Sequence, residues 1–449
     1  MKIVIVGNGV AGTFSAQNIR NLDKEVEIEI YSQEKYPYYT RVKLPELISE
    51  KITVDDLIVF KEDWYKNKRI QLNLDSKVEK IDPQTKTIEV ESKDKSISYD
   101  KLVLALGSTP NIPPIKNAIE MKNEKQGVFT LRTINDGVAI KDYIRSKSVK
   151  KAIVIGGGLL GLELANQINN SNLETTVVEF FPQLLPRQLD NDCSEMLIKE
   201  IESKGIKVIL DAATEEILGK EKVSGIKLKS GEIIDGDIVL IQAGIRPTID
   251  LAKKALLDTN RGIVVNEFLE TSEKDIFAVG DCIEYKNQIW GIIPACMEQS
   301  KIVAASVIGL KKVDYKGTTP KNTLKIVGLE LTSIGIIDPT KEEGGAWEIL
   351  KKADKKDCCY QKLILKENKL KGAILFGDTK ALSYVYNKME QDVDIDELKK
   401  LLELYIYICN NCGKEYDESK MGVLFKDLLE DFKCPDCKGP KEEFKKKNI

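Results

Sequence analysis

The sequence contains no histidine among its 449 residues. This absence excludes histidine general bases, histidine metal ligands and nucleophiles activated by histidine. Apolar runs are short, and none approaches the ~20 residues that span a bilayer. The net charge of −3 provides no basic footprint for nucleic acid. We therefore expect chemistry that needs little proton relay, with no membrane and no nucleic acid as partner.

Cysteine is scarce and unevenly distributed. Four of the nine cysteines form two C-x-x-C pairs near the end of the chain. The apolar start lacks the charged lead-in and small-residue cleavage site of a signal peptide, which favours a cytoplasmic location. In a cytoplasmic chain, such cysteine pairs indicate metal ligands and not disulfides.

A glycine loop near the start organises the first part of the chain. Four apolar residues, 3–6, predict a buried strand, and Gly7, Gly9 and Gly12 follow at the spacing of a dinucleotide-binding loop. The glycines allow a tight turn, close approach of a pyrophosphate and close packing of helix on strand. A helix that begins near residue 10 would direct free N–H groups toward the phosphates.

Two further features near this loop indicate cofactor contacts. After a second predicted strand, Ser32 and Glu34 lie where an acidic residue holds the ribose, and we favour Glu34 over Ser32. The alternative is a solvated loop carboxylate. Residues 36–45 then combine three tyrosines with Arg41 and Lys43, which suits a pyrophosphate and an aromatic ring system, although an ordinary loop with surface cations is the alternative.

A second glycine loop follows a second apolar strand. Gly156, Gly158 and Gly161 occupy the same positions of the pattern, and the next strand ends at Glu179. A carboxylate at this point accepts hydrogen bonds from a ribose 2′-hydroxyl and repels a 2′-phosphate, so NADH is favoured over NADPH. Arg187 keeps this preference moderate. Two loops imply two dinucleotides, one bound permanently and one exchanging.

Glycine turns end three further predicted strands. Gly107 and Gly244 lie in two segments of matching pattern, which we interpret as crossings between domains. Residues 271–281 form a strand that ends in Gly280 and Asp281, which places a carboxylate at the strand edge where ligands of open α/β sheets bind. Pro294 then marks the first turn of a helix.

Together these motifs resemble the FAD/NAD two-dinucleotide flavoprotein reductases, and residues 36–45 are similar to the NADH:rubredoxin oxidoreductase branch. The resemblance covers about residues 1–400. It implies that Glu34 holds the FAD ribose, that Arg41 and Lys43 lie near the FAD, and that Asp281 binds its ribityl chain. It also implies that Glu163 lies where the nicotinamide meets the flavin and that the Pro294 helix directs its dipole at the flavin. Lys43 and Glu163 are thus the candidate catalytic residues.

The segment around residue 40 contains no cysteine. Disulfide-reducing relatives carry a redox cysteine there. The resemblance therefore implies that electrons leave the flavin for something other than a thiol.

The tail carries the two cysteine pairs, Cys409 with Cys412 and Cys434 with Cys437. Four thiolates can converge tetrahedrally on zinc or iron. The last 40 or so residues resemble rubredoxins. As in rubredoxins, four aromatic residues surround the cysteine pairs: Tyr407, Tyr416, Phe432 and Phe444. The tail departs from rubredoxins in a shorter loop between the pairs and in Lys438, which replaces the usual glycine. We expect one iron, with a zinc ribbon as the alternative.

The expected fold class is α/β, with two Rossmann-type domains, a small α+β C-terminal domain and a small rubredoxin-like metal-binding domain. The predicted boundaries are 1–111 and 247–312 for the FAD domain, 112–246 for the NAD(H) domain, 313–390 for the C-terminal domain, 391–404 for a connecting helix and 405–449 for the tail.

The expected function is electron transfer from NADH through FAD to a tail iron, and then to an external acceptor. The family's usual role suggests a flavodiiron- or rubrerythrin-like acceptor in oxygen or peroxide detoxification, and the reductase could form a homodimer. Two alternatives remain: a zinc tail that docks a separate rubredoxin, and the reductase component of a nitrite reductase-like system.

Overall fold

The computed structural model describes residues 1–91, 96–310, 313–326, 328–342, 344, 346–354, 356–421 and 423–447. The chain divides into two compact units. Unit 1 comprises Met1–Val177 and Ala213–Thr318, and unit 2 comprises Val178–Ala212 and Thr319–Ile449. Among the described residues, every helix is too short or too polar to cross a bilayer.

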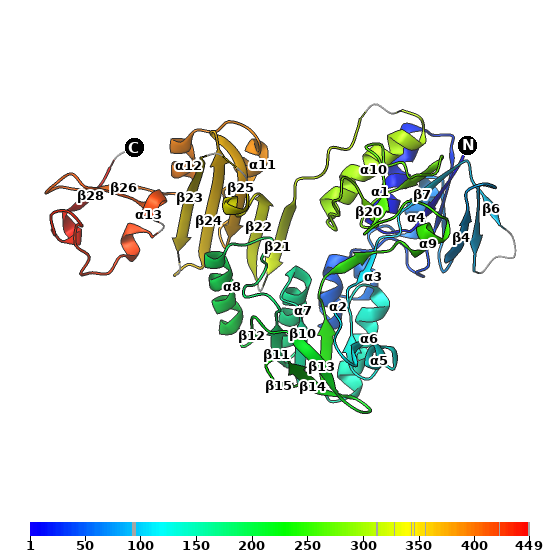
Figure 1. Cartoon of the computed structure of the whole chain (residues 1–449), viewed down its shortest axis with the longest axis horizontal. Helices are drawn as coiled ribbons and strands as arrows, with labels where there is room; N and C mark the ends of the chain where they lie inside the picture. The colour runs from blue at the N-terminus through cyan, green and yellow to red at the C-terminus, as the bar shows by residue number, and fades with distance from the viewer. Residues whose placement is uncertain are drawn as a thin grey trace. The chain divides into compact units, whose positions relative to one another are not determined.

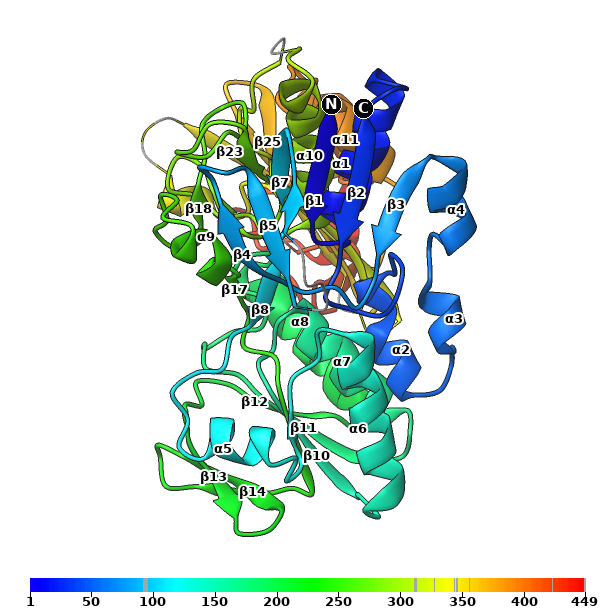
Figure 2. The ribbon, with the colours of Figure 1, turned by 90° about the vertical axis from the view of Figure 1, so that its right-hand side faces the viewer.

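Unit 1 is built on two parallel sheets, which confirms the expected α/β class. The first has the order β19 (Ile276–Ala278), β7 (Lys101–Leu104), β1 (Lys2–Val6), β2 (Glu27–Tyr31) and β3 (Ile70–Asn73). Figure 2 shows β7, β1, β2 and β3 side by side. After their first residue, the central strands β1 and β7 are apolar on both faces and buried, as helices on a parallel sheet require. Two helices, α1 (Val10–Leu22) and α10 (Ile293–Val307), pack together beside this sheet.

The second sheet of unit 1 repeats this plan. Within unit 1, its strands have the order β11 (Glu174–Val178), β10 (Lys151–Ile155), β16 (Ile238–Ile241) and β9 (Val128–Phe129). Two helices follow its strands along the chain, α6 (Ile134–Ser146) after β9 and α7 (Leu159–Asn169) after β10.

The two segments with matching patterns are neighbours in space. The strand β8 (Ser108–Pro110) pairs antiparallel with β17 (Ile245–Pro247), and Thr109 lies opposite Arg246. The two crossings between the sheets therefore form a two-stranded ribbon, which their sequences alone could only suggest.

The remaining elements of unit 1 are short. One small sheet contains β4 (Val78–Asp82), β5 (Thr87–Val90) and β6 (Ile97–Ser98). A second contains β13 (Thr214–Gly219), β14 (Val223–Leu228) and β15 (Ile233–Asp235). A third pairs β18 (Ile263–Val264) with β20 (Ile283–Glu284). Its short helices are α2 (Leu44–Ile48), α3 (Val54–Leu57), α4 (Glu62–Asn67), α5 (Ala118–Asn123) and α9 (Asp250–Lys254).

Unit 2 is centred on an antiparallel sheet. Its order is β21 (Lys321–Ile326), β22 (Leu329–Gly335), β25 (Lys369–Phe376), β24 (Cys359–Lys366) and β23 (Trp347–Asp354). The unit also contains α8 (Asn191–Ser203), β12 (Lys207–Ile209), α11 (Leu382–Lys388) and α12 (Ile395–Leu401). One apolar cluster joins β24 and β25 to α11 and α12.

The connecting helix is shorter than the predicted span 391–404. Asp394 caps the N-terminus of α12 by accepting hydrogen bonds from the backbone N–H groups of Asp396 and Glu397. Glu403 has a left-handed φ of +54°, which no helix can contain, so the helix ends before it.

The tail packs onto this C-terminal domain. Its sheet pairs β26 (Ile406–Cys409) with β27 (Glu415–Asp417) and β28 (Phe444–Lys446), and α13 (Glu418–Met421) lies beside β23 in Figure 1. Leu424 joins the apolar cluster of α11 and α12. The partly buried ion pair of Lys399 with Asp417, at 3.2 Å, adds a polar link. The tail is thus held by packed contacts, as the absence of a Gly/Ser linker suggests.

Candidate functional site

The first glycine loop connects β1 to α1 in a conformation that only glycine fits. A Cβ on Gly7, whose φ is +111°, would lie 2.1 Å from the carbonyl oxygen of Ala105. A Cβ on Gly12 would lie 2.0 Å from the carbonyl oxygen of Gly7. No side chain caps the described N-terminus of α1, whose N-cap is Gly9. The first amides of α1 are therefore available to a phosphate.

Asn8 lies within this loop and has one unsatisfied group. Its Oδ1 accepts hydrogen bonds of 3.0 Å from Thr13 Oγ1 and 3.0 Å from the hydroxyl of Tyr65. Its buried Nδ2 has no partner among the described residues. Because an unpaired buried donor costs about 1–3 kcal/mol, a ligand acceptor at this loop would stabilise the structure. The residues present therefore fit a dinucleotide.

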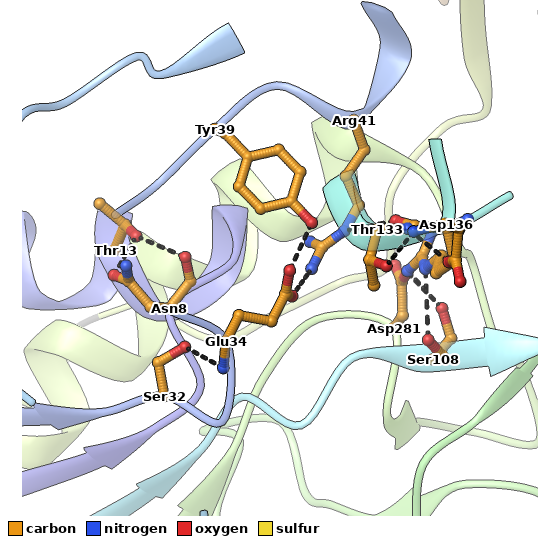
Figure 3. Close-up of polar contacts among 11 residues, drawn as sticks. Asn8, Thr13, Ser32, Glu34, Tyr39, Arg41, Ser108, Thr133, Asp136 and Asp281 are labelled. Carbon is orange, nitrogen blue, oxygen red and sulfur yellow. Dashed lines mark hydrogen bonds and ion pairs between the residues drawn. The ribbon is translucent and has the colours of Figure 1, made fainter. Parts of the chain in front are cut away.

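Glu34 is the centre of a cluster of polar contacts (Figure 3). Its Oε1 lies 2.6 Å from Nη2 of Arg41, and its Oε2 accepts a 2.6 Å hydrogen bond from the hydroxyl of Tyr39. Its own backbone N–H donates to the Ser32 hydroxyl at 3.3 Å. The Glu34 side chain is 19% exposed. The structure thus brings Ser32, Glu34 and Arg41 together, unlike a freely solvated loop carboxylate.

The protonation states of this cluster are stabilised by its members. Burial raises the pKa of Tyr39, and although Arg41 opposes this change, Glu34 adds to it. Burial alone would lower the pKa of Arg41, but Tyr39 and Glu34 raise it above its usual range. Arg41 therefore remains a cation and Tyr39 a hydrogen-bond donor at neutral pH.

A second polar cluster surrounds Asp281. Its Oδ2 lies 2.9 Å from Nη2 of Arg132 and accepts a 2.8 Å hydrogen bond from Ser108 Oγ. Arg132 Nη2 also donates to Ser108 Oγ at 2.6 Å, and Arg41 Nε donates to the carbonyl of Arg132 at 3.1 Å. The carbonyl of Arg132 therefore links the Glu34 and Asp281 clusters.

Arg132 and Ser108 were not identified from the sequence. Arg132 directly precedes a capping box at the start of α6, in which Thr133 and Asp136 exchange hydrogen bonds. The carboxylate of Asp136 also accepts from the backbone N–H of Arg132 at 3.0 Å. This Thr-x-x-Asp signal could have placed Arg132 at a helix start, but not next to Asp281.

The turn before Asp281 is held from α10. The backbone N–H of Gly280 donates to Gln299 Oε1 at 2.8 Å, and Gln299 Nε2 donates to the hydroxyl of Tyr315 at 3.1 Å. As expected, α10 has Pro294 in its first turn. These contacts fix the backbone that carries the Asp281 carboxylate.

Among the described contacts, Lys43 takes part in neither cluster. It is exposed at the end of the short 3₁₀-helix η1 (Arg41–Lys43), and it joins neither the Glu34 pair nor the Asp281 pair. The glycines of the crossing ribbon, Gly107 and Gly244, both have positive φ values, +68° and +89°, with open space where a Cβ would stand.

The second glycine loop repeats the geometry of the first. A Cβ on Gly156 would lie 2.4 Å from the carbonyl oxygen of Gln242, and one on Gly161 would lie 2.1 Å from the carbonyl oxygen of Gly156. Gly158 is the N-cap of α7, which has no side-chain cap in the described chain. The buried Nε2 of Gln242 has no partner among the described residues. This loop therefore also fits a dinucleotide.

Glu163 is the fifth residue of α7, two residues after Gly161. It accepts a 2.6 Å hydrogen bond from Gln167 Nε2, and Gln167 Oε1 accepts a 2.9 Å hydrogen bond from Ser49. Because Ser49 ends α2, the structure joins the helix of Glu163 to the segment that follows Lys43.

Glu179 belongs to unit 2, where its side chain is almost fully buried. Its Oε1 accepts a 2.9 Å hydrogen bond from the backbone N–H of Phe181, and its own N–H donates to the carbonyl of Ile209 at 2.8 Å. Arg187 is exposed on the loop that follows. The carboxylate is thus held by a backbone amide directly after β11.

The four tail cysteines converge on one point. All four Sγ atoms lie within 4.8 Å of one another, with 3.6 Å between Cys409 and Cys437 and 3.6 Å between Cys412 and Cys434. A tetrahedron of sulfurs ~2.3 Å from a metal has edges of about 3.8 Å. The donor set therefore fits one tetrahedral zinc or iron ion.

Backbone amides and aromatic rings support this site. The N–H groups of Cys437 and Asp436 lower the pKa of Cys434 to about 7, which favours the thiolate that binds metal. Cys409 and Cys434 are fully buried, whereas Cys412 and Cys437 are exposed. The buried thiols pack among the four aromatic rings predicted from the sequence, Tyr407, Tyr416, Phe432 and Phe444. Phe425 is an additional ring in this cluster.

Comparison with known proteins agrees with this geometry. Residues 1–300 match the model of the pyridine nucleotide-disulphide oxidoreductase family, and residues 320–393 match that of the rubredoxin NAD⁺ reductase C-terminal domain. These matches confirm the resemblance drawn from the motifs.

Individual relatives differ in how much of their length the chain covers. A nitrite reductase [NAD(P)H] of Bacillus subtilis is 35% identical over 89% of this chain, which covers 48% of that protein. The NADH-rubredoxin oxidoreductase of Clostridium acetobutylicum is 31% identical over 89% of this chain and 97% of its own length. Its crystal structure aligns with a TM-score of 0.71 and 28% identity, covering 90% of this chain and 99% of that one. The chain thus spans about half the length of the first of these relatives.

Proposed function

The chain belongs to the pyridine nucleotide-disulphide oxidoreductase family, and on that premise we propose that it is an NADH-dependent flavoprotein that delivers electrons to a metal centre in its own tail. The observation that carries the proposal is the convergence of four cysteine thiols in a chain that also contains two dinucleotide loops. FAD would accept a hydride from NADH and release single electrons. The protein side chains bind the two dinucleotides and the metal and hold them in position.

The first glycine loop and its two polar clusters bind the FAD in this proposal. Gly7, Gly9 and Gly12 leave room for the pyrophosphate, and Glu34, with Ser32 beside it, receives a ribose hydroxyl. Arg41 would neutralise phosphate charge, and Arg132, through its ion pair with Asp281, would hold the carboxylate that receives the ribityl hydroxyls. The unpaired Nδ2 of Asn8 supplies one further donor.

The second glycine loop and Glu179 bind NADH. The buried carboxylate of Glu179 favours a free 2′-hydroxyl over a 2′-phosphate. Glu163 is proposed to lie at the nicotinamide, and Lys43 near the flavin. The amide of Gln242 adds a buried donor that a dinucleotide could satisfy.

The tail is proposed to hold iron, which changes its charge by one electron, whereas zinc does not. Its two ligands Cys412 and Cys437 are exposed, so an external acceptor could receive electrons through them. We propose a flavodiiron- or rubrerythrin-like acceptor. A zinc tail that serves a separate rubredoxin remains the alternative.

A second candidate function rests on the B. subtilis relative. Because this chain covers 48% of that nitrite reductase, it could act as the flavin module of a larger system. Stable association with a haem-containing subunit during purification would favour this candidate.

An anaerobic spectrum during NADH titration, combined with metal analysis, tests the main proposal. Iron–thiolate bands that bleach together with the flavin bands would support it. Bleaching of flavin alone, with one zinc per chain, would contradict the redox role of the tail and leave the reductase role intact.

A further inference from the structure

Asp190 connects the segment after Glu179 to the C-terminal sheet of unit 2. Its Oδ1 caps α8 by accepting a 3.1 Å hydrogen bond from the backbone N–H of Cys193. Its Oδ2 accepts a 2.5 Å hydrogen bond from the hydroxyl of Tyr360 and lies 2.8 Å from Nζ of Lys362. Tyr360 and Lys362 are two residues apart on β24 and therefore share one face of the sheet.

This cluster is shielded from water. The Lys362 side chain is 9% exposed and that of Asp190 is 19% exposed. Burial raises the pKa of Tyr360, and Asp190 raises it further, so the phenol stays protonated and donates its hydrogen bond. Nζ of Lys362 also donates to the carbonyl of Ile337 at 3.1 Å. Removing the ammonium would leave a carboxylate in a site with little access to water.

The loop between Glu179 and Asp190 is held by hydrogen bonds near its start and at its middle. Near the first end, the Phe181 N–H donates to Glu179, and the Phe181 carbonyl accepts a 3.0 Å hydrogen bond from the N–H of Asp211. At the middle of the loop, the Leu184 N–H donates to Ser194 Oγ on α8 at 2.9 Å. The position of the loop therefore depends on where α8 begins.

From these contacts we infer that Lys362 is a positioning residue for the adenosine end of NADH, acting through Asp190 and the loop that begins at Glu179. The inference rests on the proposed role of Glu179 in binding the ribose. Lys362 and Tyr360 hold the Asp190 carboxylate, Asp190 holds the start of α8, and α8 holds the loop. The C-terminal domain thereby sets the affinity of the dinucleotide site without touching the dinucleotide.

The experiment uses ADP-ribose as the probe, because it contains the adenosine end of NADH and lacks the nicotinamide. In the full-length flavoprotein, Lys362→Met should weaken ADP-ribose binding about tenfold and raise the KM for NADH by a similar factor, with kcat changed by less than about twofold. Lys362→Arg retains the charge and should recover most of the affinity. Lys371 lies on the neighbouring strand β25 and pairs with Glu390, so Lys371→Met is the matched control, with no change expected.

The outcomes separate this inference from the proposed function. If Glu179→Ala weakens ADP-ribose binding and Lys362→Met does not, the positioning role is overturned while the NADH site stands. If the unaltered protein does not bind ADP-ribose, or if Glu179→Ala leaves ADP-ribose binding unchanged, the proposed role of Glu179 in binding NADH is contradicted.

A milder variant keeps the inference testable if Lys362→Met does not fold. Tyr360→Phe removes one hydrogen bond to Asp190 and should weaken ADP-ribose binding about threefold, with FAD content unchanged. If Tyr360→Phe folds and binds ADP-ribose as tightly as the unaltered protein, the inference is wrong.

Discussion

Lys438 occupies, in the second cysteine turn, the position that Gly413 occupies in the first. Both residues are left-handed, with φ values of +61° and +76°. Gly413 N–H donates to the carbonyl of Cys409 at 2.8 Å, and Lys438 N–H donates to that of Cys434 at 2.9 Å. The two turns therefore share one backbone conformation, and only the second forces a side chain into it.

Lys438→Gly should stabilise the tail, because glycine adopts a left-handed φ without the steric cost that a Cβ imposes. We expect a gain of about 0.5–1 kcal/mol in the free energy of unfolding, since the greater freedom of glycine in the unfolded chain offsets part of the benefit. Denaturant unfolding followed by metal–thiolate absorbance measures it. Lys438→Ala removes the same charge but keeps the Cβ, so it should show no gain; equal stabilisation by both variants would refute the backbone explanation.

Cys434→Ser should abolish metal binding and leave the reduction of flavin by NADH within about twofold of the unaltered rate, because both glycine loops lie in unit 1 and Glu179 is not one of the metal ligands. Metal analysis and stopped-flow absorbance of the flavin measure the two effects. Cys358→Ser, outside the metal cluster, is the control and should keep the metal. A collapse of flavin reduction in Cys434→Ser would show that the parts do not work as modules.

Arg41→Ala should weaken FAD binding about 10- to 100-fold, because it removes a cation and leaves the partly buried Glu34 carboxylate without its ion pair. The FAD retained after gel filtration, read from the ratio of flavin to protein absorbance, measures the change. Arg145→Ala is the control: Arg145 pairs with Glu50 on the surface, and both side chains are largely exposed. Full FAD retention in Arg41→Ala would remove Arg41 from the site.

Asp275 should make the stability of the chain sensitive to acid. Burial alone would raise its pKa, but Lys101 and Lys86 lower it below the usual value. A carboxyl with a depressed folded pKa contributes stability above its unfolded pKa of about 3.9, and that contribution disappears as the pH falls through the folded pKa. The unfolding free energy should therefore fall below about pH 4.

Asp275→Asn isolates this charge, because asparagine also accepts the left-handed φ of +67° at this position. It should lower the unfolding free energy at pH 6 by about 1–3 kcal/mol and flatten the acid dependence. Urea unfolding at pH 6 and pH 3.5 measures both. Asp63→Asn alters a surface ion pair with Lys66 and should change neither quantity by more than about 0.5 kcal/mol. An unchanged acid slope in Asp275→Asn would contradict the assignment.

Local patterns predicted much of the fold. Helix α1 begins at Val10 and α10 begins at Ile293, next to Pro294, as expected. These predictions succeed because capping, glycine turns and apolar strands are decided by neighbouring residues. The span 391–404 was harder to predict, because the cap at Asp394 and the turn at Glu403 depend on backbone conformation that periodicity does not show.

The candidate site was predictable only where its residues are close in sequence. Glu34 and Arg41 are seven residues apart, and the structure brings them together as one ion pair. Arg132 and Asp281 are 149 residues apart, and no local signal connects them. The exposed position of Lys43 was likewise invisible, because exposure depends on what packs above a residue.

The sequence by itself determined the family, the two dinucleotide loops and the four cysteines, since each depends on residue types at short and regular spacing. Only the tertiary structure decided which charges meet: Arg132 with Asp281, and Lys362 with Asp190 across 172 residues. Spacing along the chain dictates local geometry through sterics, whereas a buried ion pair forms only after distant strands and helices have packed around it.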